Sequence, residues 1–226
     1  MNKIFEPLIL AAGSHQAGSG KGCAMNVISW ENGDKQITDF PACSDSMLAR
    51  MVQRVNDALA SDDGLLSADN SVIALELGHM TVGTAYHGLS DFDLRRVYVR
   101  VACMIARKVA NLDKSDTALP CIEAAEAWAD EPTDANLTRV KSARSAAAAA
   151  AADAAYATYA AAADDAAYAA TYAAYAYAYA AAAARRAFLI EATREAILMF
   201  HDLTGTSPKP VAPEVTVEAY RKMVAV

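Results

Sequence analysis

The sequence predicts an all-α or nearly all-α protein: a helical bundle with long Ala/Tyr-rich helices and an irregular N-terminal part that contains Gly and Cys. Segment 133–204 contains neither Gly nor Pro, and apolar residues in several earlier segments recur at helical spacing. A chain of 226 residues is long enough to bury its own core. We therefore expect one domain over 1–226, with subregions at 1–70, 90–204 and 205–226.

The N-terminal part begins with a short extended or buried segment and a glycine-rich turn over 13–22. Residues 23–31 fit a helix, because the following Asn32-Gly33 pair is a typical helix stop. A second helix is expected from about Ser44, where the apolar residues follow the spacing of an amphipathic helix. These residues are Met47, Leu48, Met51, Val52, Val55 and Leu59.

The middle of the chain contains one ambiguous segment and one clear helix. The pattern over 71–82 fits either a helix or a strand. Ser90 and Asp93 match a capping box in which Asp stands in the place of Glu, so a helix is expected over 94–111. A shorter helix is expected over 120–130.

The alanine-rich segment 133–204 favours helix without help from packing, because alanine loses no side-chain entropy there. An unbroken helix would be about 108 Å long, whereas a compact domain of this size has a radius of gyration of about 17 Å. We expect at least one break, near 164–165 or within 180–186. A linker follows, and a final helix over 213–226 packs back on the bundle.

Composition excludes some function classes. The formal net charge of −7 argues against binding to long nucleic acids, which requires clustered positive charge. No apolar run is typical of a membrane-spanning helix, and the N-terminus does not match a secretory signal, so we expect a cytoplasmic protein. The four cysteines form no CxxC pair, which favours reduced, buried thiols. No cofactor is indicated.

The glycine-rich turn resembles a phosphate-binding loop only superficially. The P-loop requires Gly five positions before the Gly-Lys pair, but His15 stands there, and Gly22 replaces the Ser or Thr that holds magnesium. A looser possibility stays open. The backbone amides at the start of the helix over 23–31 could bind an anion.

His15, Cys23 and Cys43 are close in sequence and could converge. A zinc site normally shows much tighter ligand pairs, and a Cys–His nucleophilic pair is a second possibility. We expect no metal, and we interpret His15 as a turn residue that bonds nearby backbone. The enzyme alternative is a hydrolase or transferase that uses His15, Cys23 and Asp39.

Tyrosines in the segment 143–187 repeat at helical spacing. Tyr168, Tyr172, Tyr175 and Tyr179 step by four, three and four residues, which puts their rings on one helix face. A tightly packed helical interface is the simplest interpretation. An exposed tyrosine ladder that stacks planar ligands and an exposed ice-type alanine face are the alternatives.

The candidate ligand-binding residues lie in the glycine-rich turn and in the Ala/Tyr segment. They are Ser14, His15, Lys21, Cys23, Tyr168, Tyr172, Tyr175, Tyr179 and Arg185. No catalytic residue is assigned.

Short motifs resemble two groups of proteins. The Gly13-Ser-His15 sequence, the Cys23-Ala-Met sequence, the Asp39-x-Pro-x-Cys43 turn and the alanine-rich tail resemble alanine-rich accessory proteins of phages and actinobacteria. The segment 95–129 is similar to a helix pair of bacterial immunity proteins of the Imm-5 type, which an alanine-rich helix follows. The resemblance implies an all-α fold and an accessory role in bacterial or phage conflict. This chain departs from such tails in carrying Tyr where Trp, Arg or His is common.

These observations lead to a functional hypothesis. We expect a non-enzymatic binding protein that neutralises or sequesters a protein toxin or effector, or a small nucleotide-like ligand. A homodimer is expected. The alternatives are the enzyme described above and a structural protein that forms a helical assembly.

Overall fold

The computed structural model describes residues 8–110, 117–150, 182–208 and 213–225, and these residues are helical or irregular. The described part contains no strand; its nearest approach to a sheet is an isolated antiparallel bridge between Ala11 and Leu65. The prediction of an all-α fold is confirmed.

The chain divides into two compact units where the sequence led us to expect a single domain. The first unit combines Met1–His87 with Thr193–Val226, and the second covers Gly88–Ala192.

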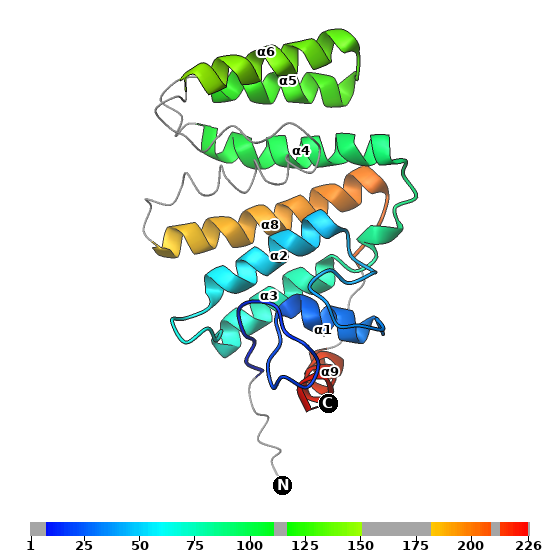
Figure 1. Cartoon of the computed structure of the whole chain (residues 1–226), viewed down its shortest axis with the longest axis vertical. Coiled ribbons are helices and arrows are strands. Elements are labelled where there is room, and N and C mark those ends of the chain that lie inside the picture. Colours follow the sequence, from blue (N-terminus) through cyan, green and yellow to red (C-terminus); the bar gives the residue numbers. More distant parts are fainter. Residues whose placement is uncertain (1–7, 111–116, 151–181, 209–212, 226) are drawn as a thin grey trace. The chain divides into compact units, whose positions relative to one another are not determined.

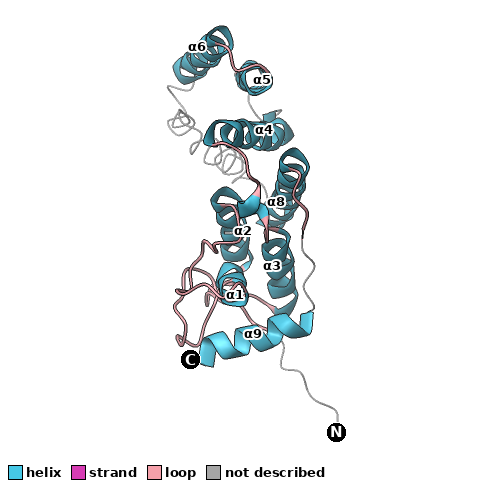
Figure 2. Cartoon of the chain, turned by 90° about the vertical axis from the view of Figure 1, so that its right-hand side faces the viewer, coloured by secondary structure: helices cyan, strands magenta, loops and turns pink. Residues whose placement is uncertain are grey.

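The first unit is built around the short helix α1. Figure 1 shows its helices, and Figure 2 shows α9 crossing close to α1. Helix α1 packs against α2, α3 and α9. The elements are α1 (Ala24–Glu31), α2 (Ser46–Leu59), α3 (Ala68–Met80), the 3-10 turn η1 (Thr84–Tyr86), the C-terminal part of α8 (Ala182–Thr204) and α9 (Pro213–Ala225).

Side-chain caps fix where the helices of this unit begin. The Asp45 carboxylate accepts hydrogen bonds from the backbone amides of Met47 and Leu48, which starts α2. The Ser67 hydroxyl accepts from the Asn70 amide and starts α3. The ambiguous segment 71–82 is therefore mostly helical, because its start signal lies four residues upstream of the segment that we considered.

The core of the first unit is closely packed around α1. Six consecutive residues of this helix, Ala24 to Ser29, are buried, as is Phe200 of α8. Gly78 lets α3 lie close to α1, because a Cβ at this position would be only 3.1 Å from the Ile28 side chain.

Helix α9 packs back on the N-terminal segment, as the sequence predicts. The Tyr220 hydroxyl donates a hydrogen bond to the Ile9 carbonyl oxygen at 2.7 Å. The buried Met223 side chain covers Gly22, where a Cβ would lie 2.2 Å from the Met223 methyl group. The C-terminal helix therefore covers one side of the glycine-rich turn.

The second unit contains α4 (Asp91–Val109), α5 (Ala118–Asp130) and α6 (Asp134–Ala150), with α5 packed against both of its neighbours. Ser90 caps α4: its hydroxyl accepts from the Asp93 amide and donates to the Asp93 carboxylate. Four apolar residues of α4 are buried at helical spacing. They are Val97, Val101, Ile105 and Val109.

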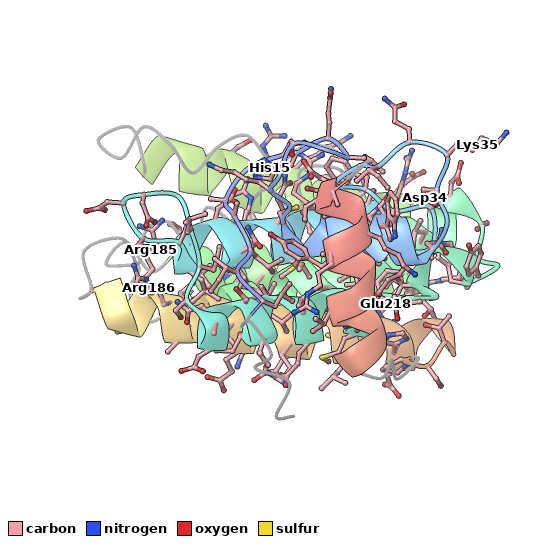
Figure 3. All side chains as sticks on the ribbon, turned by 90° about the horizontal axis from the view of Figure 1, so that it is seen from below. His15, Asp34, Lys35, Arg185, Arg186 and Glu218 are labelled. Carbon is pink, nitrogen blue, oxygen red and sulfur yellow. The ribbon has the colours of Figure 1, made fainter. Side chains whose placement is uncertain are left out.

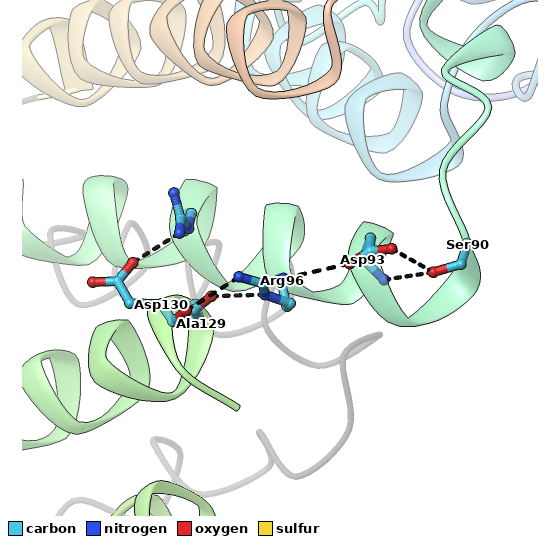
Figure 4. Close-up of polar contacts among 6 residues, drawn as sticks. Ser90, Asp93, Arg96, Ala129 and Asp130 are labelled. Atoms are coloured by element: carbon cyan, nitrogen blue, oxygen red, sulfur yellow. Dashed lines mark hydrogen bonds and ion pairs between the residues drawn. The ribbon is translucent and has the colours of Figure 1, made fainter. Parts of the chain in front are cut away.

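Arginines of α4 bind the C-terminal end of α5 (Figure 4). Arg96 donates from Nε to the Ala129 carbonyl at 2.8 Å and from a terminal nitrogen to the Asp130 carbonyl at 3.2 Å. Arg100 pairs with the Asp130 carboxylate at 2.8 Å. The Arg96 contacts satisfy backbone carbonyl groups that a helix end leaves without partners, and the positive charge of Arg100 is favourable at the same helix end.

The long alanine-rich segment is described only at its ends. Helix α6 runs to Ala150 and α8 begins at Ala182. The predicted break near 164–165 and the four tyrosines of the predicted face lie outside the described residues. In the described part of the chain, no helix is both long enough and apolar enough to cross a membrane.

Two positions on α8 test the packing of the first unit. Phe200 is 0% exposed and Leu198 is 49% exposed. We expect Phe200→Ala to lower the free energy of unfolding by about 3 to 5 kcal/mol, because it leaves a cavity in the core. Leu198→Ala, the matched control, should cost less than about 1 kcal/mol. Urea unfolding followed by circular dichroism measures both, and equal losses would contradict this core assignment.

Candidate functional site

The glycine-rich turn is closed by hydrogen bonds to other parts of the first unit. The Ala12 amide donates to the Gly64 carbonyl, and the Gly18 amide donates to the Met223 carbonyl at 3.0 Å. The Gly13 amide donates to the Asp57 carboxylate at 2.8 Å. The backbone of the turn is thus held by α2, by the loop after it and by α9.

The first turn of α1 is occupied by side chains of the protein itself. The Cys23 amide donates to the Asn26 side-chain oxygen at 3.1 Å, and the Ala24 amide donates to the Asn56 side-chain oxygen at 3.1 Å. The Cys23 sulfur faces the backbone amide of Asn26 in a reciprocal capping box. These two amides therefore donate hydrogen bonds within the protein, whereas the sequence had left open that they bind an anion.

Asp39 connects three elements beneath the surface. Its Oδ1 accepts from the Asn26 side-chain amide at 2.9 Å and from the Cys23 thiol at 3.4 Å. Its Oδ2 accepts from the Gln53 side-chain amide at 2.8 Å. The residue is only 7% exposed. Because three donors satisfy the buried carboxylate, Asp39 holds the loop 34–43 against α1 and α2.

The surroundings of Cys23 keep its sulfur protonated. The residue is 0% exposed. Burial, with the negative charge of Asp39 as a smaller contribution, raises the pKa of the Cys23 thiol from 9.0 to about 12. A nucleophilic cysteine requires a lowered pKa and access to substrate. The sequence led to two expectations for Cys23, a reduced buried thiol and a ligand contact, and the structure agrees with the first: the residue is enclosed and donates a hydrogen bond.

The loop 34–43 is also fixed along its length. The Asp34 Oδ2 accepts from the Ser29 hydroxyl at 2.8 Å and from the Ala42 amide at 3.2 Å. The Thr38 amide donates to the same Ser29 hydroxyl at 3.2 Å. At the far end, the Cys43 carbonyl accepts from backbone amides at the start of η1. These bonds make the loop a rigid part of the first unit.

The other predicted ligand-binding residues that the structure describes belong to the glycine-rich turn and to α8. Ser14 and Lys21 are exposed on the glycine-rich turn, and His15 is half-buried, with Nε2 2.9 Å from the Ala12 carbonyl oxygen. The local bond of His15 agrees with its interpretation as a turn residue. Arg185 is half-buried in the part of α8 that belongs to the second unit. Figure 3 labels His15 and Arg185.

The remaining histidines take part in packing contacts. His79 Nε2 lies 2.8 Å from the Glu31 carboxylate. His201 lies 2.7 Å from the Met80 carbonyl oxygen and 2.7 Å from the Thr206 hydroxyl, and His87 packs edge-on against Phe200. Within the described ranges, no three His, Cys, Asp or Glu residues gather as metal ligands.

Sequence reasoning missed the amide side chains that complete the site. Asn26, Gln53 and Asn56 lie on α1 and α2, where their spacing has no known motif. It also missed Phe40, which is 41% exposed. The sequence does carry a signal for Phe40. It is an aromatic residue between Asp39 and Pro41, in a turn, where polar residues usually predominate.

Comparison with protein-family models, curated proteins and solved structures finds no match to this chain. The resemblance to alanine-rich and immunity proteins stays a prediction.

The pKa of Cys23 predicts how stability depends on pH. The unfolded thiol ionises near pH 9 and the folded one near 12, so the folded state binds more protons between these values. The stabilisation that this pKa difference provides is fully present below pH 9 and is lost as the pH rises from about 9 to about 12. From pH 8 to 10, wild type should lose about 1.4 kcal/mol more unfolding free energy than Cys23→Ala.

The matched control for this measurement is Val27→Ala. Val27 is a buried residue of α1 near Cys23, and its side chain does not titrate. Its unfolding free energy should change with pH in parallel with wild type. A Cys23→Ala profile that is also parallel to wild type would contradict the raised pKa.

The Asp39 contacts predict a second stability effect. Asp39→Ala leaves the Asn26, Gln53 and Cys23 donors without their acceptor, and we expect a loss of about 2 to 4 kcal/mol. Asp39→Asn should cost less, because it keeps one acceptor oxygen. Exposed Asp62→Ala is the control and should change stability by no more than about 0.5 kcal/mol. Urea unfolding gives the values, and hydrogen exchange over 34–43 shows whether the loop loosens; unchanged exchange in Asp39→Ala would contradict the anchoring role.

Proposed function

We propose that this chain is a non-enzymatic binding protein that neutralises or sequesters a protein toxin or effector in bacterial or phage conflict. The observation that supports it is the hydrogen bonding of Cys23 and Asp39, two of the three residues that the enzyme alternative needs. Their contacts enclose the Cys23 thiol and anchor the loop 34–43. Both side chains therefore stabilise the fold around this loop.

The rigidity of that surface favours binding. Asp34, Asp39 and Ser29 hold the loop 34–43 in one conformation. A preformed loop loses little conformational entropy when a partner docks, so more of the interaction energy becomes affinity. Binding and recognition residues also lie preferentially on loops that a stable scaffold positions.

A protein partner is favoured over a small nucleotide-like ligand. Sites for small molecules enclose most of the ligand surface. The exposed residues of this loop, including Phe40, face outward from the first unit. Such residues are suited to the broad surface of another protein.

Stoichiometry distinguishes this function from catalysis. Candidate protein toxins are each mixed with increasing amounts of the protein, and residual toxicity is measured. Sequestration predicts that protection is complete only when the protein at least equals the toxin in amount. A detoxifying enzyme would protect at a small fraction of that ratio.

Cys23→Ala serves as the matched variant in the same assay. If its circular dichroism shows an intact fold, it should protect as well as wild type. Protection at strongly substoichiometric amounts, or its loss in folded Cys23→Ala, would contradict the proposal and favour the enzyme alternative.

A further inference from the structure

Phe40 is held at the surface by its two neighbours in the chain. Asp39 is buried and hydrogen-bonded to α1 and α2, and Pro41 is buried on the other side. The Phe40 side chain is nevertheless 41% exposed. Large aromatic side chains are usually more enclosed than this. Because both neighbours are fixed, the ring cannot turn inward without disrupting the buried network.

Local hydrogen bonds stabilise this conformation. The Phe40 amide donates to the Thr38 hydroxyl at 3.2 Å, and the Thr38 amide donates to the Ser29 hydroxyl at 3.2 Å. Asp34 bridges Ser29 and the Ala42 amide. The backbone on both sides of Phe40 is therefore bonded to α1 or to the loop itself.

Arg50 of α2 covers one face of the Phe40 ring. Its guanidinium carbon lies 5.5 Å from the ring centre, which is a cation–π distance. Arg50 is itself exposed, so its guanidinium group stays accessible to solvent. Aromatic residues and arginine are the side chains that most often dominate the energy of protein interfaces.

Between residues 34 and 50, the charged side chains that are exposed are both positive, Lys35 and Arg50. The Asp39 and Asp45 carboxylates are buried and that of Asp34 is half-buried, and all three accept hydrogen bonds within the protein. Lys35 of the same loop is exposed and, in Figure 3, points away from the fold. In a chain with a formal net charge of −7, this surface presents cations, and it is therefore complementary to an acidic partner.

We propose that Phe40 and Arg50, with Lys35 on the same loop, form a docking surface for an acidic segment of a partner protein. We call these three residues the Phe40 surface. An apolar side chain of the partner packs on the face of the Phe40 ring that Arg50 leaves open, and neighbouring carboxylates pair with the Arg50 guanidinium group. The inference rests on the proposed binding function and adds the chemistry of the partner.

A library of short random peptides displayed on phage tests the Phe40 surface without a known partner. Selection is carried out in parallel on wild type and on Arg50→Glu. Wild type should enrich peptides in which Asp or Glu lies next to an aromatic or branched aliphatic residue. Arg50→Glu should no longer enrich acidic peptides, because the charge that attracts them is reversed.

A synthetic copy of the most enriched peptide is then titrated by calorimetry. Its affinity should fall about tenfold or more in Phe40→Ala and in Arg50→Glu and should weaken as salt is raised. Val72→Ala changes another exposed apolar residue of the first unit and should leave the affinity within about twofold. Circular dichroism establishes that all three variants are folded.

The outcomes separate this inference from the proposed function. A selection that yields no acidic peptides, or an acidic peptide whose affinity survives Phe40→Ala and Arg50→Glu, overturns the Phe40 surface. If stoichiometric protection against the toxin is still observed, the binding function stands and another surface carries it. Substoichiometric protection overturns the binding function itself, whatever the peptides show.

Discussion

The buried Asp39 carboxylate is the interaction on which the N-terminal unit depends. A carboxylate removed from water is costly unless donors surround it, and here Asn26, Gln53 and Cys23 supply three. Two of these donors come from α1 and its cap and the third comes from α2. The charge therefore joins the loop 34–43 to both helices, and the position of every residue on that loop follows from it.

The same arrangement determines the chemistry of Cys23. A thiol at a helix N-terminus is usually made more acidic by the helix dipole. At this site burial and the Asp39 charge outweigh the dipole, and the pKa of the thiol rises to about 12. A residue that looks reactive in the sequence thus becomes a weak hydrogen-bond donor in the structure. This reversal is the reason why we propose recognition rather than nucleophilic catalysis for the N-terminal site.

In both units, side chains bond the backbone groups that a helix end leaves without partners. In the first, side chains of Asn26 and Asn56 occupy the amides at the start of α1. In the second, Arg96 and Arg100 bind the end of α5. Helix termini are thus joined to neighbouring elements through groups that would otherwise require water. In the first unit, Phe40 of the loop 34–43 and Arg50 of α2 stay exposed beside these internally bonded groups.

The sequence by itself determined several of the helices, because local signals specify them. Ser90 and Asp93 marked the start of α4, Asn32-Gly33 the end of α1, and apolar spacing the buried face of α2. It favoured a buried Cys23 without specifying the contacts of the thiol, and it did not indicate that Phe40 is exposed. Those outcomes depend on Asp39 meeting Asn26 and Gln53, which lie 13 and 14 residues away from it along the chain. The local sequence pattern does not predict these side-chain contacts, because only the packing of α1 on α2 brings the three side chains together.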